Sequence, residues 1–319
     1  MKKMNSMALV LLVVYGVMCS QILPAFSSIR LNNRPIIGIL AQENRLRDPQ
    51  PQGTSYIAAS YVKYLEAAGA RVVPIRINLT DAEYEKLFYS INGLLLPGGE
   101  VDLETSQYAR IAKIFYNLAV KANDDSDYFP IWGICLGFEQ LTVLTSGINV
   151  LTKTKTQGVG MPLSFTSDAM ESRLFGFFPE DLMQALATED ITANYHEWSL
   201  SVQNYTANAK LMNFYKILST NTDGKIEFIS TMEAFKYPFY GMQWHPEKNA
   251  FEWVDKSGMS HSPSALKAAF YTADFFVNEA KKNFHYFEDE EDESKALIYN
   301  YCPVFKGQDS IFIQNYYFD

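Results

Sequence analysis

Short apolar runs alternate with segments of helical spacing along the first half of the chain. The apolar runs at residues 35–40, 71–75, 91–96 and 128–132 are typical of strands buried on both faces of a sheet. Helical spacing predicts helices over 55–68 and 108–122, and a Thr-x-x-Glu capping box predicts another over 80–88. This alternation predicts an α/β fold with a doubly wound, mainly parallel sheet and helices on both faces.

The pattern changes after residue 144. Residues 148–166 and 217–240 are expected to form added β-hairpins, and Asn-Thr-Asp-Gly at 221–224 is the clearest turn. A strand is expected over 240–244 and a helix over 263–281, whereas the acidic run 288–293 is interpreted as a solvated loop. No internal repeat or linker is visible, so residues 28–319 are predicted to form a single domain.

The N-terminus has the pattern of a secretory signal peptide. Two lysines precede an apolar run at 7–18 that is too short to span a bilayer, and a small-x-small cleavage site ends at Ser27. We therefore expect residues 1–27 to be removed, with an uncleaved anchor as the alternative. The mature chain would then have no membrane attachment and would reach the lysosome, the extracellular space or both.

Composition limits the class of possible partners and indicates whether the cysteines form a disulfide. The 319 residues carry 27 Lys and Arg against 36 Asp and Glu, and the resulting net charge of −9 argues against a nucleic-acid partner. Of three cysteines, Cys19 would leave with the signal peptide, so Cys135 and Cys302 are predicted to be free thiols. Asn78 and Asn204 begin Asn-x-Thr sequons and are the expected glycosylation sites.

Cys135 lies at a predicted sharp corner between a strand and a helix. It is the centre of Gly-Ile-Cys-Leu-Gly, in which the two glycines permit a strained backbone and a close approach by a substrate. The start of the following helix is expected to lower the pKa of the thiol, which would favour a nucleophilic thiolate. The alternative is that Cys135 is a small buried apolar residue.

Two further segments supply groups that a cysteine nucleophile needs. Gly98 and Gly99 follow a predicted strand. The Gly99 N–H could therefore form an oxyanion hole with the N–H of Leu136, with Gly98 beside the substrate. His245 follows another predicted strand, and a histidine can accept the thiol proton and later protonate a leaving amine. Glu247 stands two residues later, where it could orient the imidazole ring.

These motifs, in this order, resemble the class I glutamine amidotransferase superfamily, and most closely its gamma-glutamyl hydrolase family. The similarity covers residues 34–280 and rests on four segments, at 96–103, 132–139, 221–230 and 240–247. It implies a Cys135-His245-Glu247 triad that cleaves the gamma-linked glutamate chains of folates and antifolates through a thioester on Cys135. No metal-ligand spacing appears and no cofactor is required. The oligomeric state stays open, with a homodimer as one alternative.

Two positions stand apart from the amidotransferase motifs. Glu139 occupies a place where amidotransferases commonly have glutamine, and we expect it to accept a hydrogen bond from the substrate, or else to pair with a cation. The resemblance assigns His196 to substrate binding or catalysis, with a structural role as the alternative. Two rival functions also stay open, a glutaminase-type amidotransferase subunit and a catalytically inactive secreted binding protein of the same fold.

Overall fold

Eight strands form the central sheet of the computed structural model, which describes residues 30–45, 51–253, 256–307 and 310–319. Contacts group Asn32–Asp319 into one unit. The predicted signal peptide lies outside the described residues, so its removal stays a prediction. In the described ranges, every helix is too short or too polar to cross a membrane.

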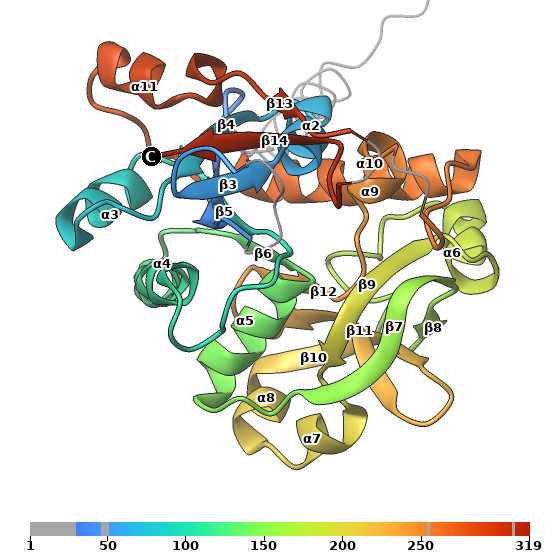
Figure 1. Ribbon diagram of the computed structural model, residues 1–319. Helices are drawn as coiled ribbons and strands as arrows, with labels where there is room; N and C mark the ends of the chain where they lie inside the picture. Colours follow the sequence, from blue (N-terminus) through green and yellow to red (C-terminus); the bar gives the residue numbers. More distant parts are fainter. Residues whose placement is uncertain (1–29, 46–50, 254–255, 308–309) are drawn as a thin grey trace, which may run out of the picture. The chain divides into compact units, whose positions relative to one another are not determined.

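The order of the central sheet is β4-β1-β5-β6-β12-β11-β10-β8 (Figure 1). In the same order, the strands are Arg71–Ile75, Ile36–Leu40, Gly93–Leu96, Ile131–Ile134, Phe239–Met242, Glu227–Ala234, Tyr215–Thr222 and Ser164–Phe165. The first five strands in this order, β4, β1, β5, β6 and β12, pair in parallel. The last three, β11, β10 and β8, continue the sheet with antiparallel pairing. The predicted α/β fold with a mainly parallel sheet is confirmed.

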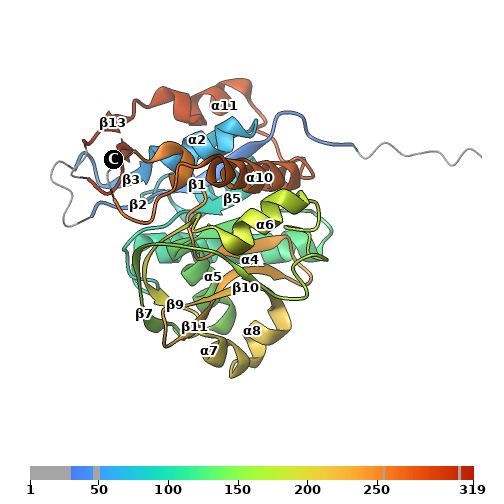
Figure 2. The ribbon, with the colours of Figure 1, turned by 90° about the vertical axis from the view of Figure 1, so that its right-hand side faces the viewer.

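Helices cover both faces of this sheet. The helices of the described residues are α2 (Ala59–Ala67), α3 (Asp81–Phe88), α4 (Gln107–Asp124), α5 (Leu136–Ser146), α6 (Glu180–Thr188), α7 (Val202–Thr206), α8 (Ala209–Phe214), α9 (Lys248–Phe251), α10 (Pro263–Ala280), α11 (Glu290–Ala296) and the 3-10 turn Ile298–Asn300. Two views at right angles place α2 and α10 on one side of the sheet and α4 and α5 on the other (Figures 1 and 2). The predicted capping box is present at Thr80, which begins α3.

Two smaller sheets flank the central one. The first has the order β13-β14-β3-β2 and joins Val304–Phe305, Gln314–Phe318, Ser55–Ala58 and Gln42–Glu43. The second pairs β7 (Thr152–Met161) with β9 (Thr192–Ser199). An isolated antiparallel β-bridge between Ala193 and His245 joins β9 to the segment that follows β12.

Three predicted elements are wrong, and each has a physical reason. The predicted helix over 55–68 begins only at Ala59, because Ser55–Ala58 pairs with the distant strand β14. Residues 148–166 form no hairpin, since β7 pairs with β9 and β8 pairs with β10. α11 begins within the acidic run and extends beyond it, and its first-turn carboxylates favour a helix N-terminus. The hairpin at 221–224 is confirmed as β10–β11.

The parallel strands bring chemistry-bearing residues to one edge of the sheet. β1, β5, β6 and β12 are neighbours, and their carboxyl ends lead into Gln42, Gly98, Cys135 and His245. The helix after β6 packs very closely on β5, because a Cβ on Gly137 would lie 2.0 Å from the carbonyl oxygen of Leu96. Only glycine permits this approach.

We predict that Gly137→Ala lowers the free energy of unfolding by about 3 kcal/mol, because the added methyl group must displace backbone. Denaturant unfolding measures the change. The control is Gly224→Ala in the β10–β11 turn, where nothing lies near the added atom and only the positive φ of 90° opposes it. The free energy of unfolding of that control should fall by about 1 kcal/mol. Equal losses in the two variants would contradict the close packing of α5.

Candidate active site

Cys135 occupies the corner between β6 and α5 in a rare backbone conformation. Its φ of 53° and ψ of −108° are unusual for a residue with a side chain, and such strain is concentrated at functional sites. The Cys135 N–H donates to the carbonyl of Met242 at 2.8 Å, and the Cys135 carbonyl accepts from the Glu139 N–H at 3.0 Å. The corner is therefore tied to β12 on one side and begins α5 on the other.

His245 and Glu247 form a buried pair at the end of β12. His245 Nδ1 lies 2.7 Å from Glu247 Oε1, and the His245 N–H donates to the carbonyl of Ala193 at 2.9 Å. Burial disfavours a charged Glu247, yet the electrostatic interaction and hydrogen bond with His245 hold the pKa of Glu247 below its usual value. Glu247 thus points inward as an ionised partner of the imidazole, as an orienting role requires.

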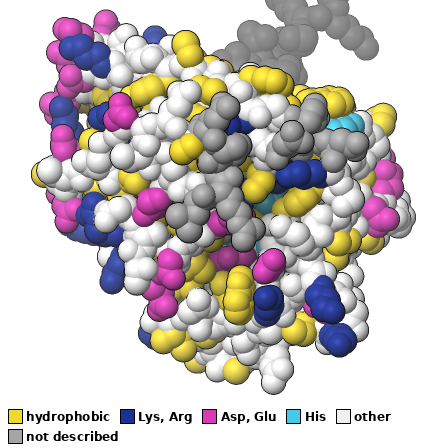
Figure 3. All heavy atoms as spheres, viewed as in Figure 1, with side chains coloured by type: hydrophobic (Ala, Val, Ile, Leu, Met, Phe, Trp, Pro, Cys, Tyr) yellow, Lys and Arg dark blue, Asp and Glu magenta, His cyan; other side chains and the backbone are white. Residues whose placement is uncertain are grey.

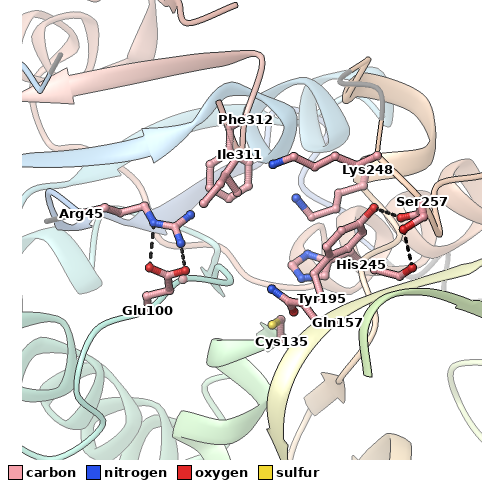
Figure 4. A pocket seen from close by; sticks show the side chains of 13 residues that line it. Arg45, Glu100, Cys135, Gln157, Tyr195, His245, Lys248, Ser257, Ile311 and Phe312 are labelled. Atoms are coloured by element: carbon pink, nitrogen blue, oxygen red, sulfur yellow. Dashed lines mark hydrogen bonds and ion pairs between the residues drawn. The ribbon is translucent and has the colours of Figure 1, made fainter. Parts of the chain in front are cut away.

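Cys135 and His245 line the same cavity, of about 390 Å³ (Figure 4). Its walls also include Gly99 from the loop after β5, Tyr195 from β9 and Phe312 from the segment before β14. The space-filling view shows a hollow near the centre of this face, where charged and histidine side chains meet hydrophobic ones (Figure 3). A substrate in this hollow would reach both the sulfur and the imidazole.

Burial sets the protonation of the resting site. It raises the pKa of the Cys135 thiol well above its usual value, assisted by the charges of Glu139 and Glu247, and the opposing effects of Lys248 and the Leu136 N–H are smaller. Burial likewise lowers the pKa of His245. The N–H at the helix start does lower the thiol pKa, as expected, but burial outweighs it, so the expected net lowering is not found. The resting pair is a neutral thiol and a neutral imidazole, so the sulfur must lose its proton as it attacks.

The glycine loop leaves no room for side chains. A Cβ on Gly98 would lie 2.8 Å from His245 Cε1 and 3.1 Å from Cys135 Cβ, and one on Gly99 would lie 1.7 Å from Gln42 Oε1. Gln42 also donates to the Gly98 carbonyl at 2.8 Å, which fixes the loop. The Leu136 N–H is hydrogen-bonded to the sulfur. The oxyanion role of Gly99 and Leu136 stays a prediction.

Glu139 lies in the first turn of α5 and is almost completely buried. Its Oε1 accepts a hydrogen bond from Gln243 Nε2 at 2.9 Å, and burial raises its pKa to about 8. Its hydrogen bond is thus to an amide and not to a cation. Glu139 does not line the cavity described above, so its predicted contact with substrate stays a prediction.

His196 lies on β9 with both ring nitrogens engaged inside the protein. Nε2 lies 3.1 Å from Asn194 Oδ1, and Nδ1 lies 2.9 Å from Thr156 Oγ1. Burial lowers the pKa of His196 to about 3, so the ring is neutral. These contacts are typical of a structural histidine, and the ring is not part of the cavity wall. A role in substrate binding or catalysis stays a prediction.

Tyr61 is a site residue that the sequence did not reveal. Its hydroxyl accepts from the Gly98 N–H at 2.9 Å and lies 3.3 Å from His245 Nδ1. Burial raises its pKa well above the usual value, so the hydroxyl keeps its proton. Tyr61 therefore links the glycine loop to the imidazole from α2. In the sequence it is one apolar-face residue of a helix, and nothing in that spacing distinguishes it from core.

The remaining predicted residues lie outside the cavity. Cys302 is a free thiol, as is Cys135 within the cavity, and both were predicted to be free. Asn78 is exposed, and its amide donates to the carbonyl of Asp319 at 2.6 Å. Asn204 is partly buried, and its amide donates to the carbonyl of Val150 at 2.7 Å. Glycosylation of either asparagine stays a prediction.

Comparison with known proteins decides the family. The model of the peptidase C26 family matches residues 35–247, more than half of the chain, including both Cys135 and His245. The chain belongs to the peptidase C26 family. The predicted resemblance to gamma-glutamyl hydrolases is confirmed with it.

Named relatives and a solved structure agree with this family. Human gamma-glutamyl hydrolase is 59% identical over 286 residues, which cover 90% of each chain. Gamma-glutamyl hydrolase B of Dictyostelium discoideum is 40% identical over 292 residues, covering 91% of this chain and 84% of that one. The glutaminase domain of Trypanosoma brucei CTPS with bound acivicin has a TM-score of 0.50 at 12% identity, over 80% of this chain and 97% of that one. This last similarity concerns the fold alone.

We predict that Tyr61→Phe slows alkylation of Cys135 by iodoacetamide about 10-fold, because the imidazole that takes the thiol proton loses a positioning hydrogen bond. The matched control is Tyr116→Phe, which removes a buried hydroxyl that bonds Thr145 at 3.0 Å, outside the residues that line the cavity. That control should react at the wild-type rate. Identical rates in the two variants would exclude a positioning role for Tyr61.

Proposed function

We propose that this chain hydrolyses gamma-glutamyl bonds, with poly-gamma-glutamyl folates and antifolates as its substrates. The main support is that Cys135 and the His245 of the His245–Glu247 pair line one cavity. The chain is also 59% identical to human gamma-glutamyl hydrolase. No cofactor is part of the proposal. The same chemistry in a glutaminase would release ammonia, since a gamma-glutamyl peptide and glutamine share their acyl group.

The geometry supports a two-step reaction through a thioester. The Cys135 sulfur attacks the gamma carbonyl while its proton passes to Nε2 of His245, because Glu247 occupies Nδ1. The oxyanion is stabilised by the N–H groups of Gly99 and Leu136. His245 then gives its proton to the leaving nitrogen, and the C–N bond breaks. Water attacks the thioester, transfers a proton through His245 to the sulfur, and releases the acid.

The N-terminal pattern supports a mature enzyme of the secretory pathway, in the lysosome, the extracellular space or both. The lowered pKa of His245 suits an acidic compartment, because the imidazole stays neutral, and able to act as a base, below the usual histidine pKa. The net charge of −9 supports a small-molecule substrate over a nucleic acid.

Incubation of the purified chain with pteroyl polyglutamate, followed by product analysis, tests the function. We expect shorter pteroyl glutamates and free glutamate or gamma-linked glutamate peptides. Cys135→Ala should be folded and inactive, because the thioester cannot form. Release of ammonia from glutamine without cleavage of gamma-glutamyl peptides would indicate a glutaminase. Binding without turnover would indicate an inactive binding protein.

The pH dependence of kcat/KM tests the pairing of His245 with Glu247. Activity should fall as the pH decreases through the His245 pKa, which lies below its usual value because burial outweighs the opposing charge of Glu247. Glu247→Gln removes that charge and lowers the His245 pKa further, so the acid limb should move to lower pH. The rate at the optimum should fall about 10- to 100-fold as orientation is lost. The exposed control Glu197→Gln should keep the wild-type profile, and an unmoved acid limb in Glu247→Gln would contradict the pairing.

A further inference from the structure

Lys248 places a buried positive charge in the wall of the catalytic cavity. The residue directly follows Glu247, begins α9 and is only 2% exposed. It lines the same cavity as Cys135 and His245 (Figure 4). A lysine is almost never this buried unless something accounts for its charge.

Two aromatic rings and two carboxylates lie near Lys248. Its Nζ lies 4.3 Å from the ring centre of Phe312 and 5.4 Å from that of Tyr195, so two aromatic faces attract the cation. Glu247 pairs with His245 and Glu252 accepts the Ile313 N–H at 2.7 Å. Burial opposes ionisation of both carboxylates, and the charge of Lys248 favours it. Across the described ranges, no ion pair joins Lys248 to a carboxylate. Its N–H donors therefore remain for an anion in the cavity.

The position of Lys248 selects one side of the substrate. The Tyr195 ring that faces Lys248 lies 6.3 Å from the His245 ring. His245 is the group that protonates the leaving nitrogen in the proposed reaction. From this adjacency we assign the Lys248 side of the cavity to the leaving group.

We propose that Lys248 binds the α-carboxylate of the glutamate that leaves, an assignment that rests on the proposed function. In a gamma-linked chain this carboxylate is separated from the scissile nitrogen by a single carbon. A cation beside His245 can therefore hold it while the imidazole protonates that nitrogen. The lysine would select glutamate as the leaving group over a simple amine or ammonia.

The charge of the cavity agrees with an anionic chain. Arg45 and Lys256 line the same cavity as Lys248, and Arg45 forms an ion pair with Glu100. Burial, followed by the charges of Lys248 and Arg45, lowers the pKa of Lys256. Such mutual repulsion among cations is relieved by bound carboxylates, and a gamma-linked chain carries one on every residue.

The test compares two substrates that differ only in the leaving residue. One is an N-acylated gamma-glutamyl glutamate, and the other carries a primary amide in place of the terminal α-carboxylate. The wild type should cleave the first with a kcat/KM about 10- to 100-fold higher, the factor expected for a hydrogen bond to a charged group. Lys248→Met should lose that preference by slowing on the carboxylate substrate alone. Lys267→Met, at a lysine paired with Asp181 and absent from the cavity wall, should retain it.

Each other outcome overturns the assignment. An equal loss on both substrates in Lys248→Met would make the lysine a general structural or electrostatic element and leave gamma-glutamyl hydrolysis standing. If the variant does not fold, the wild type alone decides, because absence of a preference between the two substrates excludes a carboxylate contact. A wild type that cleaves neither substrate would remove the proposed function together with this assignment.

Discussion

The close packing of α5 on the ends of β5 and β6 determines where the chemistry takes place. Gly133 and Gly137 let the first turn of the helix approach the strands until a single added carbon would meet backbone oxygen. Cys135 holds its strained conformation at this junction, at the edge of the sheet. The oxyanion donor, the imidazole and the cavity walls are all arranged around that fixed sulfur.

Burial then controls the electrostatics of the site. Cys135 and His245 are both nearly inaccessible to solvent, so each favours its neutral form in the resting state. Glu247 favours its charged form despite burial, because its interaction with His245 stabilises the carboxylate. Proton transfer therefore accompanies attack, and a low-dielectric cavity strengthens every interaction with the charges that develop.

Much of the fold followed from local pattern, because parallel strands buried on both faces are continuous apolar runs. β1, β4, β5 and β6 were predicted near their observed bounds for this reason. Ser55–Ala58 was misassigned because its partner, β14, lies at the other end of the chain and leaves no local signal. The same limit applies to the site. Cys135 and His245 were predicted because they lie in sequence motifs, whereas Tyr61 was missed because it has the spacing of a core residue.

Phe312 reaches the cavity from the segment that precedes β14, and β14 is held by pairing with β3. The wall that packs beside Lys248 is therefore contributed by a part of the polypeptide synthesised long after the nucleophile and its base. Without that segment, this part of the cavity wall would be missing. Enclosure of the reactive thiol thus requires the C-terminal segment to dock on β3.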